Sequence, residues 1–118
     1  MSAIHLTKGG FLRRVNDYEN NGGGWQFKGD KPVLIDFFAT WCGPCKALSP
    51  VIDDLAKEFE GRVDIYKVDV DQESELAAQF GVRSIPTLVF ASKDLEPQVT
   101  VGAMPKSALK EALEQMLK

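Results

Sequence analysis

The stretch VLIDFFATWCGPCK, residues 33–46, decides the fold of this chain. Residues 33–39 form an almost continuous apolar run, which indicates a strand buried on both faces in the middle of a sheet. From Cys42 to Phe59 the apolar residues recur at helical spacing, which predicts a long helix directly after that strand. A strand that passes into a helix in this way is typical of an α/β domain built from βαβ units.

The rest of the chain alternates between strand and helix patterns. Further strands are predicted at residues 3–6, 63–70, 86–91 and 99–101. Further helices are predicted after the N-cap residue Thr7, at residues 73–80 and after Pro105. No repeat or internal linker divides the pattern, so its 118 residues are expected to form a single domain, residues 1–118.

One segment departs from this alternation. Residues 19–31 are rich in Asn and Gly and have little that could fill a core, so they are predicted to form a surface loop. Trp25 and Phe27 are expected to anchor this loop against the body of the protein; the alternative is an exposed patch that binds a partner. A composition of 44% hydrophobic and 26% charged residues excludes disorder for the chain as a whole.

The charge balance narrows the class of partner. With 14 basic and 17 acidic residues the net charge is −3, and without a basic cluster nucleic acid is not an expected ligand. No run of apolar residues is long enough to cross a membrane. The opening MSAIH shows no leader, which favours the cytoplasm; an exported protein whose leader was replaced by Met1 would read the same.

The only two cysteines, Cys42 and Cys45, are separated by Gly43 and Pro44. Two cysteines cannot build a disulfide framework, and with His5 as the only histidine the ligands of a zinc site are lacking, so no metal is expected. At the start of a helix, free backbone N–H groups and the helix dipole favour a thiolate.

This spacing and position predict a dithiol–disulfide couple. Cys42, nearer the helix start and the surface, is the expected attacking thiolate, and Cys45 is expected to resolve the mixed disulfide. The alternative is two ordinary buried cysteines that happen to lie three residues apart.

Four features together resemble the thioredoxin family over nearly the whole chain. They are the WCGPC motif at residues 41–45, Asp36 six residues before Cys42, the SIPT sequence at residues 84–87, and Val101-Gly102-Ala103. The resemblance implies the thioredoxin fold, with a central mixed β-sheet of five strands (or four) flanked by four helices. It also implies that Trp41, Gly43 and Pro44 form the active-site turn.

Asp36 stands inside the apolar strand, where desolvation should raise the pKa of its carboxyl group. By resemblance, Asp36 relays a proton to and from the Cys45 thiol through water, and Lys67 matches the lysine that partners this aspartate. The alternatives are an Asp36 that points outward from an edge strand and a Lys67 that is simply solvated.

The resemblance also implies a binding surface for substrate. Pro86 is expected to be cis, and the backbone of Ile85 is expected to pair with an extended substrate segment. An apolar collar would then surround Cys42; its residues are Trp41, Ile85, Pro86, Val101, Gly102 and Ala103.

The function implied is that of a protein-disulfide reductase. It would hold no bound cofactor, act as a monomer on disulfide-containing proteins, and receive electrons from an NADPH-linked thioredoxin reductase. Gly43-Pro44 between the cysteines is similar to the reducing branch of the fold. The alternatives are an exported thiol–disulfide oxidoreductase or isomerase of similar fold, and a binding module without redox activity.

Three positions depart from the family pattern. Phe38 stands where tryptophan is common, and Thr40 stands where an acidic residue is frequent. Lys93-Asp94 replaces the usual Asn-Gly of a hairpin turn, so that turn is expected to be looser or longer.

Overall fold

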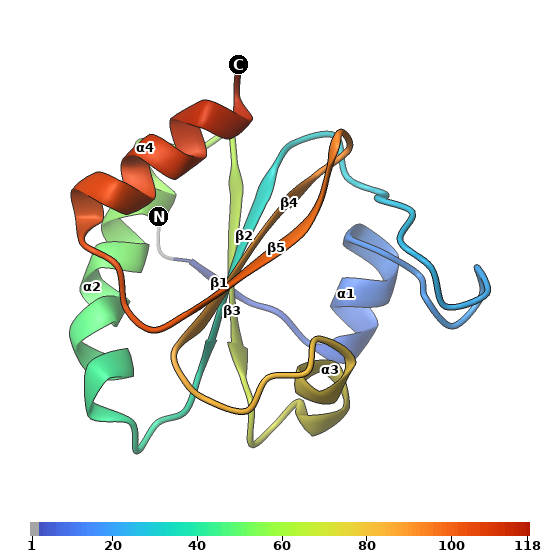
Figure 1. The fold of residues 1–118 in the computed structure, drawn as a ribbon, viewed down its shortest axis with the longest axis horizontal. Helices are drawn as coiled ribbons and strands as arrows, with labels where there is room; N and C mark the ends of the chain where they lie inside the picture. The colour runs from blue at the N-terminus through green and yellow to red at the C-terminus, as the bar shows by residue number, and fades with distance from the viewer. Residues whose placement is uncertain (1–2) are drawn as a thin grey trace.

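The computed structural model describes residues 3–118, and these contain five strands and four helices (Figure 1). In chain order they are β1 (Ile4–His5), α1 (Lys8–Arg14), β2 (Val33–Phe38), α2 (Gly43–Glu58), β3 (Asp64–Asp69), α3 (Ser74–Gln79), β4 (Thr87–Ser92), β5 (Leu95–Val101) and α4 (Lys106–Met116). Met1 and Ser2, the first two residues of the opening MSAIH, lie outside the described residues. Each predicted strand and helix is present, and the sheet described here has five strands rather than four.

The strands form one mixed sheet in the order β1-β3-β2-β4-β5. The pairs β1–β3 and β3–β2 are parallel, whereas β2–β4 and β4–β5 are antiparallel. β2 therefore has a hydrogen-bonded neighbour on each side, and its first five residues are buried. This confirms the central position that its apolar run predicts.

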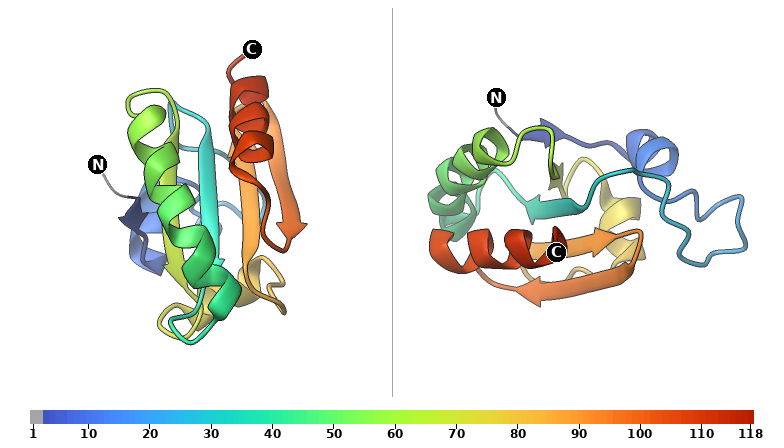
Figure 2. Two further views of the ribbon diagram at one scale, coloured as in Figure 1. Left: turned by 90° about the vertical axis from the view of Figure 1, so that its left-hand side faces the viewer. Right: turned by 90° about the horizontal axis from the view of Figure 1, so that it is seen from above.

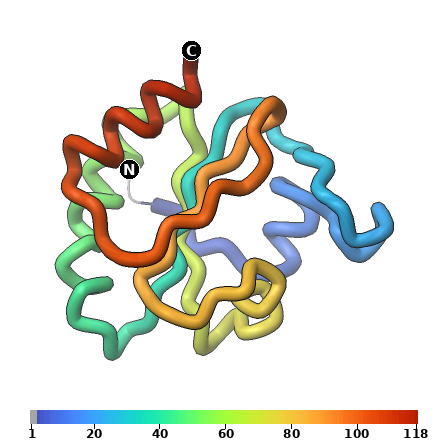
Figure 3. The backbone as a smooth tube through the Cα atoms, viewed as in Figure 1, coloured from blue at the N-terminus to red at the C-terminus, as the bar shows by residue number. Residues whose placement is uncertain are grey.

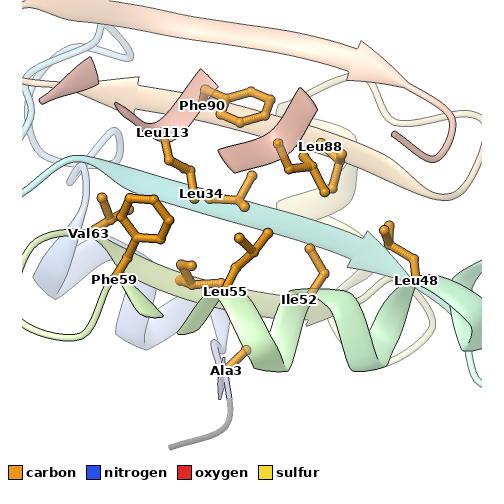
Figure 4. Packing of buried hydrophobic residues seen from close by; sticks show 12 residues of the cluster. Ala3, Leu34, Leu48, Ile52, Leu55, Phe59, Val63, Leu88, Phe90 and Leu113 are labelled. Carbon is orange, nitrogen blue, oxygen red and sulfur yellow. The ribbon is translucent and has the colours of Figure 1, made fainter. Parts of the chain in front are cut away.

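Helices cover both faces of the sheet (Figure 2). α2 and α4 pack on one face, and α1 and α3 pack on the other. Because alternate residues of a strand point to opposite faces, Leu34 packs under α2 and α4, while Ile35 and Phe37 pack on the side of α1 and α3. Figure 4 shows Leu34 among the apolar side chains of α2, including Leu55. The same alternation turns Asp36 towards α2.

α2 begins and ends where its sequence predicts. Cys42 is the N-cap residue, Pro44 occupies the first turn, where the missing N–H of proline is not needed, and Phe59 is the C-cap. Gly61 follows with φ of +81°, a backbone conformation that favours glycine after a helix.

The β4–β5 hairpin corrects one expectation. Ser92 pairs with Leu95, so Lys93 and Asp94 alone form the turn, which is tight rather than looser or longer. Among the described residues only glycines have positive φ, so this turn does not use the backbone conformation that Asn-Gly would supply. The strands instead adjust through an irregularity in register between Phe90 and Ser92.

The predicted loop at residues 19–31 projects beside α1, as the tube in Figure 3 shows. Trp25 and Phe27 stack with their ring centres 6.0 Å apart and pack against the core on the α1 side, which confirms their anchoring position. From residue 3 to residue 118, no helix combines the length and the apolar character that crossing a membrane requires.

Candidate active site

The predicted site residues meet at one edge of the sheet. The parallel strands β2 and β3 both end there, and antiparallel β4 begins there while β5 ends there. The strand register shows this arrangement. Thr87 of β4 pairs with Phe37 of β2 on one side and with Val101 of β5 on the other, in a row next to that edge. The edge lies at the bottom of Figure 1, where β2 passes into α2. Segments distant in sequence are thus placed around Cys42.

Cys42 and Cys45 form a disulfide whose Cα atoms are 5.2 Å apart, within the usual range for such bonds. Cys42 precedes the first residue of α2, Gly43, and the backbone N–H of Cys45 donates a hydrogen bond to the Cys42 Sγ at 3.2 Å. In the reduced protein the same N–H group and the start of the helix favour negative charge on that sulfur.

The expectation that Cys42 lies nearer the surface is only weakly reflected in its exposure. Cys42 is 5% exposed and Cys45 is 3% exposed. Their surroundings differ more clearly, since Trp41 beside Cys42 is 69% exposed, whereas Cys45 lines a cavity that also reaches the buried Lys67. Cys42 therefore borders the outer surface of the site, and Cys45 borders its interior.

Contacts of the backbone bring Ile85 of the apolar collar to Cys42 and join Pro86 to Gly102. The Ile85 carbonyl oxygen lies 3.9 Å from the Cys42 Sγ, and the Ile85–Pro86 peptide bond is cis, as the resemblance implies. The backbone N–H of Gly102 donates to the carbonyl oxygen of Pro86 at 2.8 Å, which ties the end of β5 to the start of β4. Val101, the last residue of β5, is 66% exposed.

The backbone conformation at Gly102 favours glycine. Its φ is +97°, which side chains other than glycine rarely adopt, and a Cβ built there would meet open space. Ala103 follows it and is exposed.

Asp36 is fully buried on the central strand, so the alternative of an outward-facing edge residue is wrong. Within the described part of the chain, neither of its carboxylate oxygens has a hydrogen-bond partner. Burial raises the pKa of the Asp36 carboxyl from 3.8 to about 6, while the positive charge of Lys67 lowers it and the negative charge of Asp53 raises it. Such a group can gain or lose a proton near neutral pH.

Lys67 is the register partner of Asp36 on β3 and is buried, so the alternative of a solvated lysine is wrong. Its ammonium group does not bond to Asp36. It donates a hydrogen bond to the Ser49 Oγ and lies 5.2 Å from the centre of the Phe38 ring. The acid and the cation are thus neighbours without being directly paired.

Two residues of this site were missed by the sequence-based prediction. Ser49 lies on α2 one turn after Cys45, and that i+4 spacing was an available signal that both face the same way. Asp71 follows the end of β3 and accepts a hydrogen bond from the Trp41 indole N–H at 2.9 Å. Its place after a parallel strand next to β2 was a weaker signal.

A cavity of about 240 Å³ lies beside the disulfide, and its lining includes Thr40, Cys45, Lys46, Ser49 and Lys67. A larger hollow of about 550 Å³ lies between β5 and α4 and is lined by none of the predicted site residues. Across residues 3–118 no three His, Cys, Asp or Glu side chains are grouped so that they could hold a metal ion.

A close pair of cysteines at a helix start, with a buried carboxyl group on the preceding strand, can exchange disulfides with another molecule. Fold and site together define the chain as a thiol–disulfide oxidoreductase. It belongs to the thioredoxin family, whose model, described as "Thioredoxin", matches residues 25–115.

Similar proteins agree with this assignment. The chain is 44% identical to the thioredoxin of Borreliella burgdorferi over 112 residues, which is 95% of each chain. It is 50% identical to the thioredoxin of Haemophilus influenzae over 86 residues, covering 73% of this chain and 80% of that one. The chloroplastic M-type thioredoxin of Spinacia oleracea is 41% identical over 109 residues, covering 90% of this chain and 59% of the relative.

A solved structure shows the same fold. The N21Q mutant thioredoxin from Halobacterium salinarum NRC-1 superposes with a TM-score of 0.77 at 32% sequence identity. The match covers 99% of this chain and 92% of the other. The thioredoxin fold that the sequence motifs imply is therefore confirmed.

Proposed function

We propose that this chain is a protein-disulfide reductase that works through the Cys42–Cys45 couple. The observation that carries the proposal is the disulfide at the start of α2, with its outer sulfur beside the Ile85 carbonyl group. Membership of the thioredoxin family and relatives named thioredoxin support it.

The reaction begins from the reduced dithiol. The Cys42 thiolate attacks one sulfur of a substrate disulfide; the new bond forms as the substrate S–S bond breaks, and the first substrate thiolate leaves and takes a proton. Cys45 then attacks the Cys42 sulfur, the intramolecular disulfide forms, and the second substrate thiolate leaves. Two electrons have passed from the chain to the substrate.

Asp36 is the proposed proton acceptor for Cys45 when that thiol becomes a nucleophile, with Lys67 as its partner. A carboxyl group whose pKa is raised to about 6 by burial can take this proton and return it to water near neutral pH. The cavity between Cys45 and Lys67 supports a route through water.

Substrate is proposed to lie across the apolar collar. An extended segment next to a substrate cysteine can pair with the backbone of Ile85, while Trp41 and Val101 offer exposed apolar surface on either side. Pro86, Gly102 and Ala103 complete this surface, and Gly43 and Pro44 shape the turn between the cysteines.

The partners follow from the family. We infer that the chain acts as a monomer on disulfide-containing proteins, that an NADPH-linked thioredoxin reductase restores the dithiol, and that no cofactor is bound. Residues 1–118 are proposed to act as one domain. A reducing compartment such as the cytoplasm suits a reductant whose only two cysteines form the redox pair, although one relative named above is chloroplastic.

An equilibrium redox titration of the cysteine pair in graded thiol buffers tests the function. A midpoint near about −270 mV, typical of thioredoxins, is expected for a reductant. A midpoint of about −120 to −180 mV would instead favour an oxidant or isomerase, the second candidate function. The absence of any reversible transition would favour a binding module.

The roles of the two cysteines are tested by matched substitutions. Cys42→Ser is expected to abolish turnover of a protein disulfide, whereas Cys45→Ser is expected to accumulate a mixed disulfide with substrate through Cys42. If Cys42→Ser kept its turnover, the assignment of the nucleophile would be wrong. If a variant with both Cys42→Ser and Cys45→Ser kept full biological function, redox chemistry would not be the function.

A further inference from the structure

The bonding of Lys67 is unexpected for a lysine beside a buried acid. Its ammonium group has three N–H donors, and Asp36 offers two oxygens without a hydrogen-bond partner within residues 3–118. Nevertheless, the hydrogen bond from Lys67 goes to the hydroxyl of Ser49, and the face of the Phe38 ring lies on the same cation. The cation is therefore held by two groups other than the acid.

Ser49 reaches Lys67 because of its place on α2. It lies four residues after Cys45, so both side chains face the sheet side of the helix, and both line the same cavity. Its partner lies 18 residues further along the chain on β3. The hydroxyl thus links the helix that carries the cysteines to the strand that carries the cation.

We propose that Ser49 is a positioning residue of this site, whose hydroxyl, together with the Phe38 ring, holds the Lys67 ammonium beside the cavity at Cys45 and away from the Asp36 carboxylate. The proposal deepens the proposed function, on which its role in catalysis rests. Among the described residues, the hydrogen bond of the Ser49 side chain goes to Lys67 and not to either cysteine sulfur.

The electrostatic consequence concerns Asp36. The charged groups that act on it are Lys67 from β3 and Asp53 from α2, while its partner on β4 is the apolar Leu88. His5 of β1 is the register partner of Lys67, and Lys46 of α2 lines the same cavity as Lys67. A direct bond from Lys67 would stabilise the carboxylate and make Asp36 a weaker proton acceptor, so holding the cation away keeps the acid active near neutral pH.

The test is the titration of the Asp36 side-chain carboxyl by NMR in the oxidised protein, where neither cysteine titrates. In Ser49→Ala the ammonium loses its acceptor and is expected to turn to Asp36, so the titration midpoint moves to lower pH than in the parent. No shift, or a shift to higher pH, would overturn the proposal.

A double-mutant cycle separates this effect from a general loosening of the site. If Ser49 acts through the cation, Ser49→Ala should leave the Asp36 midpoint unchanged when it is added to Lys67→Met. If Ser49→Ala only loosened the packing and admitted water, it would shift the Asp36 midpoint both in the parent and in Lys67→Met, and this result would overturn the proposal. Any contribution from His5 is present in both proteins and does not affect the comparison. The titration needs no turnover, so the result for Ser49 stands apart from failure of the reductase assay.

Discussion

Trp41 donates its indole N–H to the Asp71 carboxylate at 2.9 Å, across a sequence separation of 30 residues. The bond joins the loop after β2 to the loop after β3, at the edge of the sheet where the cysteines lie. Trp41 is mostly exposed, so little packing fixes its ring, and the bond to Asp71 supplies an orientation that packing does not. Asp71 is thus linked to the exposed surface of the site through the Trp41 ring.

Asp71→Ala is expected to lower kcat/KM for a protein disulfide about fivefold, because one exposed hydrogen bond contributes on the order of 1 kcal/mol to the orientation of Trp41. Asp71→Asn keeps an acceptor oxygen and is the matched control, with kcat/KM near that of the parent. The ring itself can be followed by fluorescence in a Trp25→Phe background, which leaves Trp41 as the only tryptophan. Equal kcat/KM for Asp71→Ala and the parent would show that the bond does not position Trp41 for substrate.

Burial of Asp36 predicts a pH dependence of stability. Its pKa is about 6 in the folded protein against an ordinary value of 3.8, so between these pH values the folded state binds more protons than the unfolded state. The contribution of Asp36 to the free energy of unfolding therefore falls as pH rises from about 4 to about 6 and stays level above that range. The loss is about 3 kcal/mol at about 1.4 kcal/mol per pH unit.

Asp36→Asn removes this titration, so the fall in its free energy of unfolding between pH 4 and pH 6 should be smaller by about that amount. Denaturant unfolding of the oxidised protein and of this variant at a series of pH values measures the difference. Parallel curves for the two proteins would mean that Asp36 titrates alike in the folded and unfolded states, contrary to its burial.

The sequence predicted the central strand and the acid because local pattern alone determines both. An apolar run on each side of Asp36 places it on a strand covered on both faces, and the spacing of Cys42 and Cys45 at a helix start places the sulfurs together. These inferences require no knowledge of which side chains meet across the sheet.

The bonds Lys67–Ser49 and Trp41–Asp71 could not be predicted in the same way. Each joins residues on different elements, and each depends on which rotamer a long side chain adopts when more than one partner is within reach. The prediction of a looser or longer β4–β5 turn was wrong for a related reason. The tight turn at Lys93 and Asp94 is accompanied by an irregularity in strand register between Phe90 and Ser92, which the turn residues alone do not predict.

Exposure of Val101 predicts a selective effect on large substrates. Val101→Glu should lower kcat/KM for a protein disulfide about tenfold, because a charge replaces apolar surface that substrate would bury, while a small aromatic disulfide should react as with the parent. Val99→Glu is the matched control, since Val99 lies on the same face of β5 two residues earlier and is 49% exposed. Equal losses for both variants would indicate a general effect of charge rather than contact at the collar.

Asn16 organises the loop that follows α1, and its side chain is buried although it is polar. Its amide nitrogen donates to the carbonyl oxygen of Gly24 at 3.1 Å, and its amide oxygen accepts hydrogen bonds from the Gln26 backbone at 3.0 Å and the Asn21 side chain at 2.9 Å. These bonds close the Asn- and Gly-rich segment on itself, which its composition alone would leave without fixed structure.

Asn16→Ala is therefore expected to lower the free energy of unfolding by about 2 kcal/mol, since three hydrogen bonds of a buried side chain are lost. Amide hydrogen exchange should become faster at Gln26, whose N–H loses its acceptor. Exchange of the β2 amides should still require global unfolding. Asn20→Ala is the matched control, because the Asn20 side chain bonds only to the exposed Asp17 carboxylate oxygen in the described chain. Reduction of a protein disulfide should be unchanged in both variants, because the loop lies on the α1 side of the sheet and contributes none of the collar residues. A loss of kcat/KM in Asn16→Ala at a temperature where the variant remains folded would instead assign the loop a part in choosing substrates.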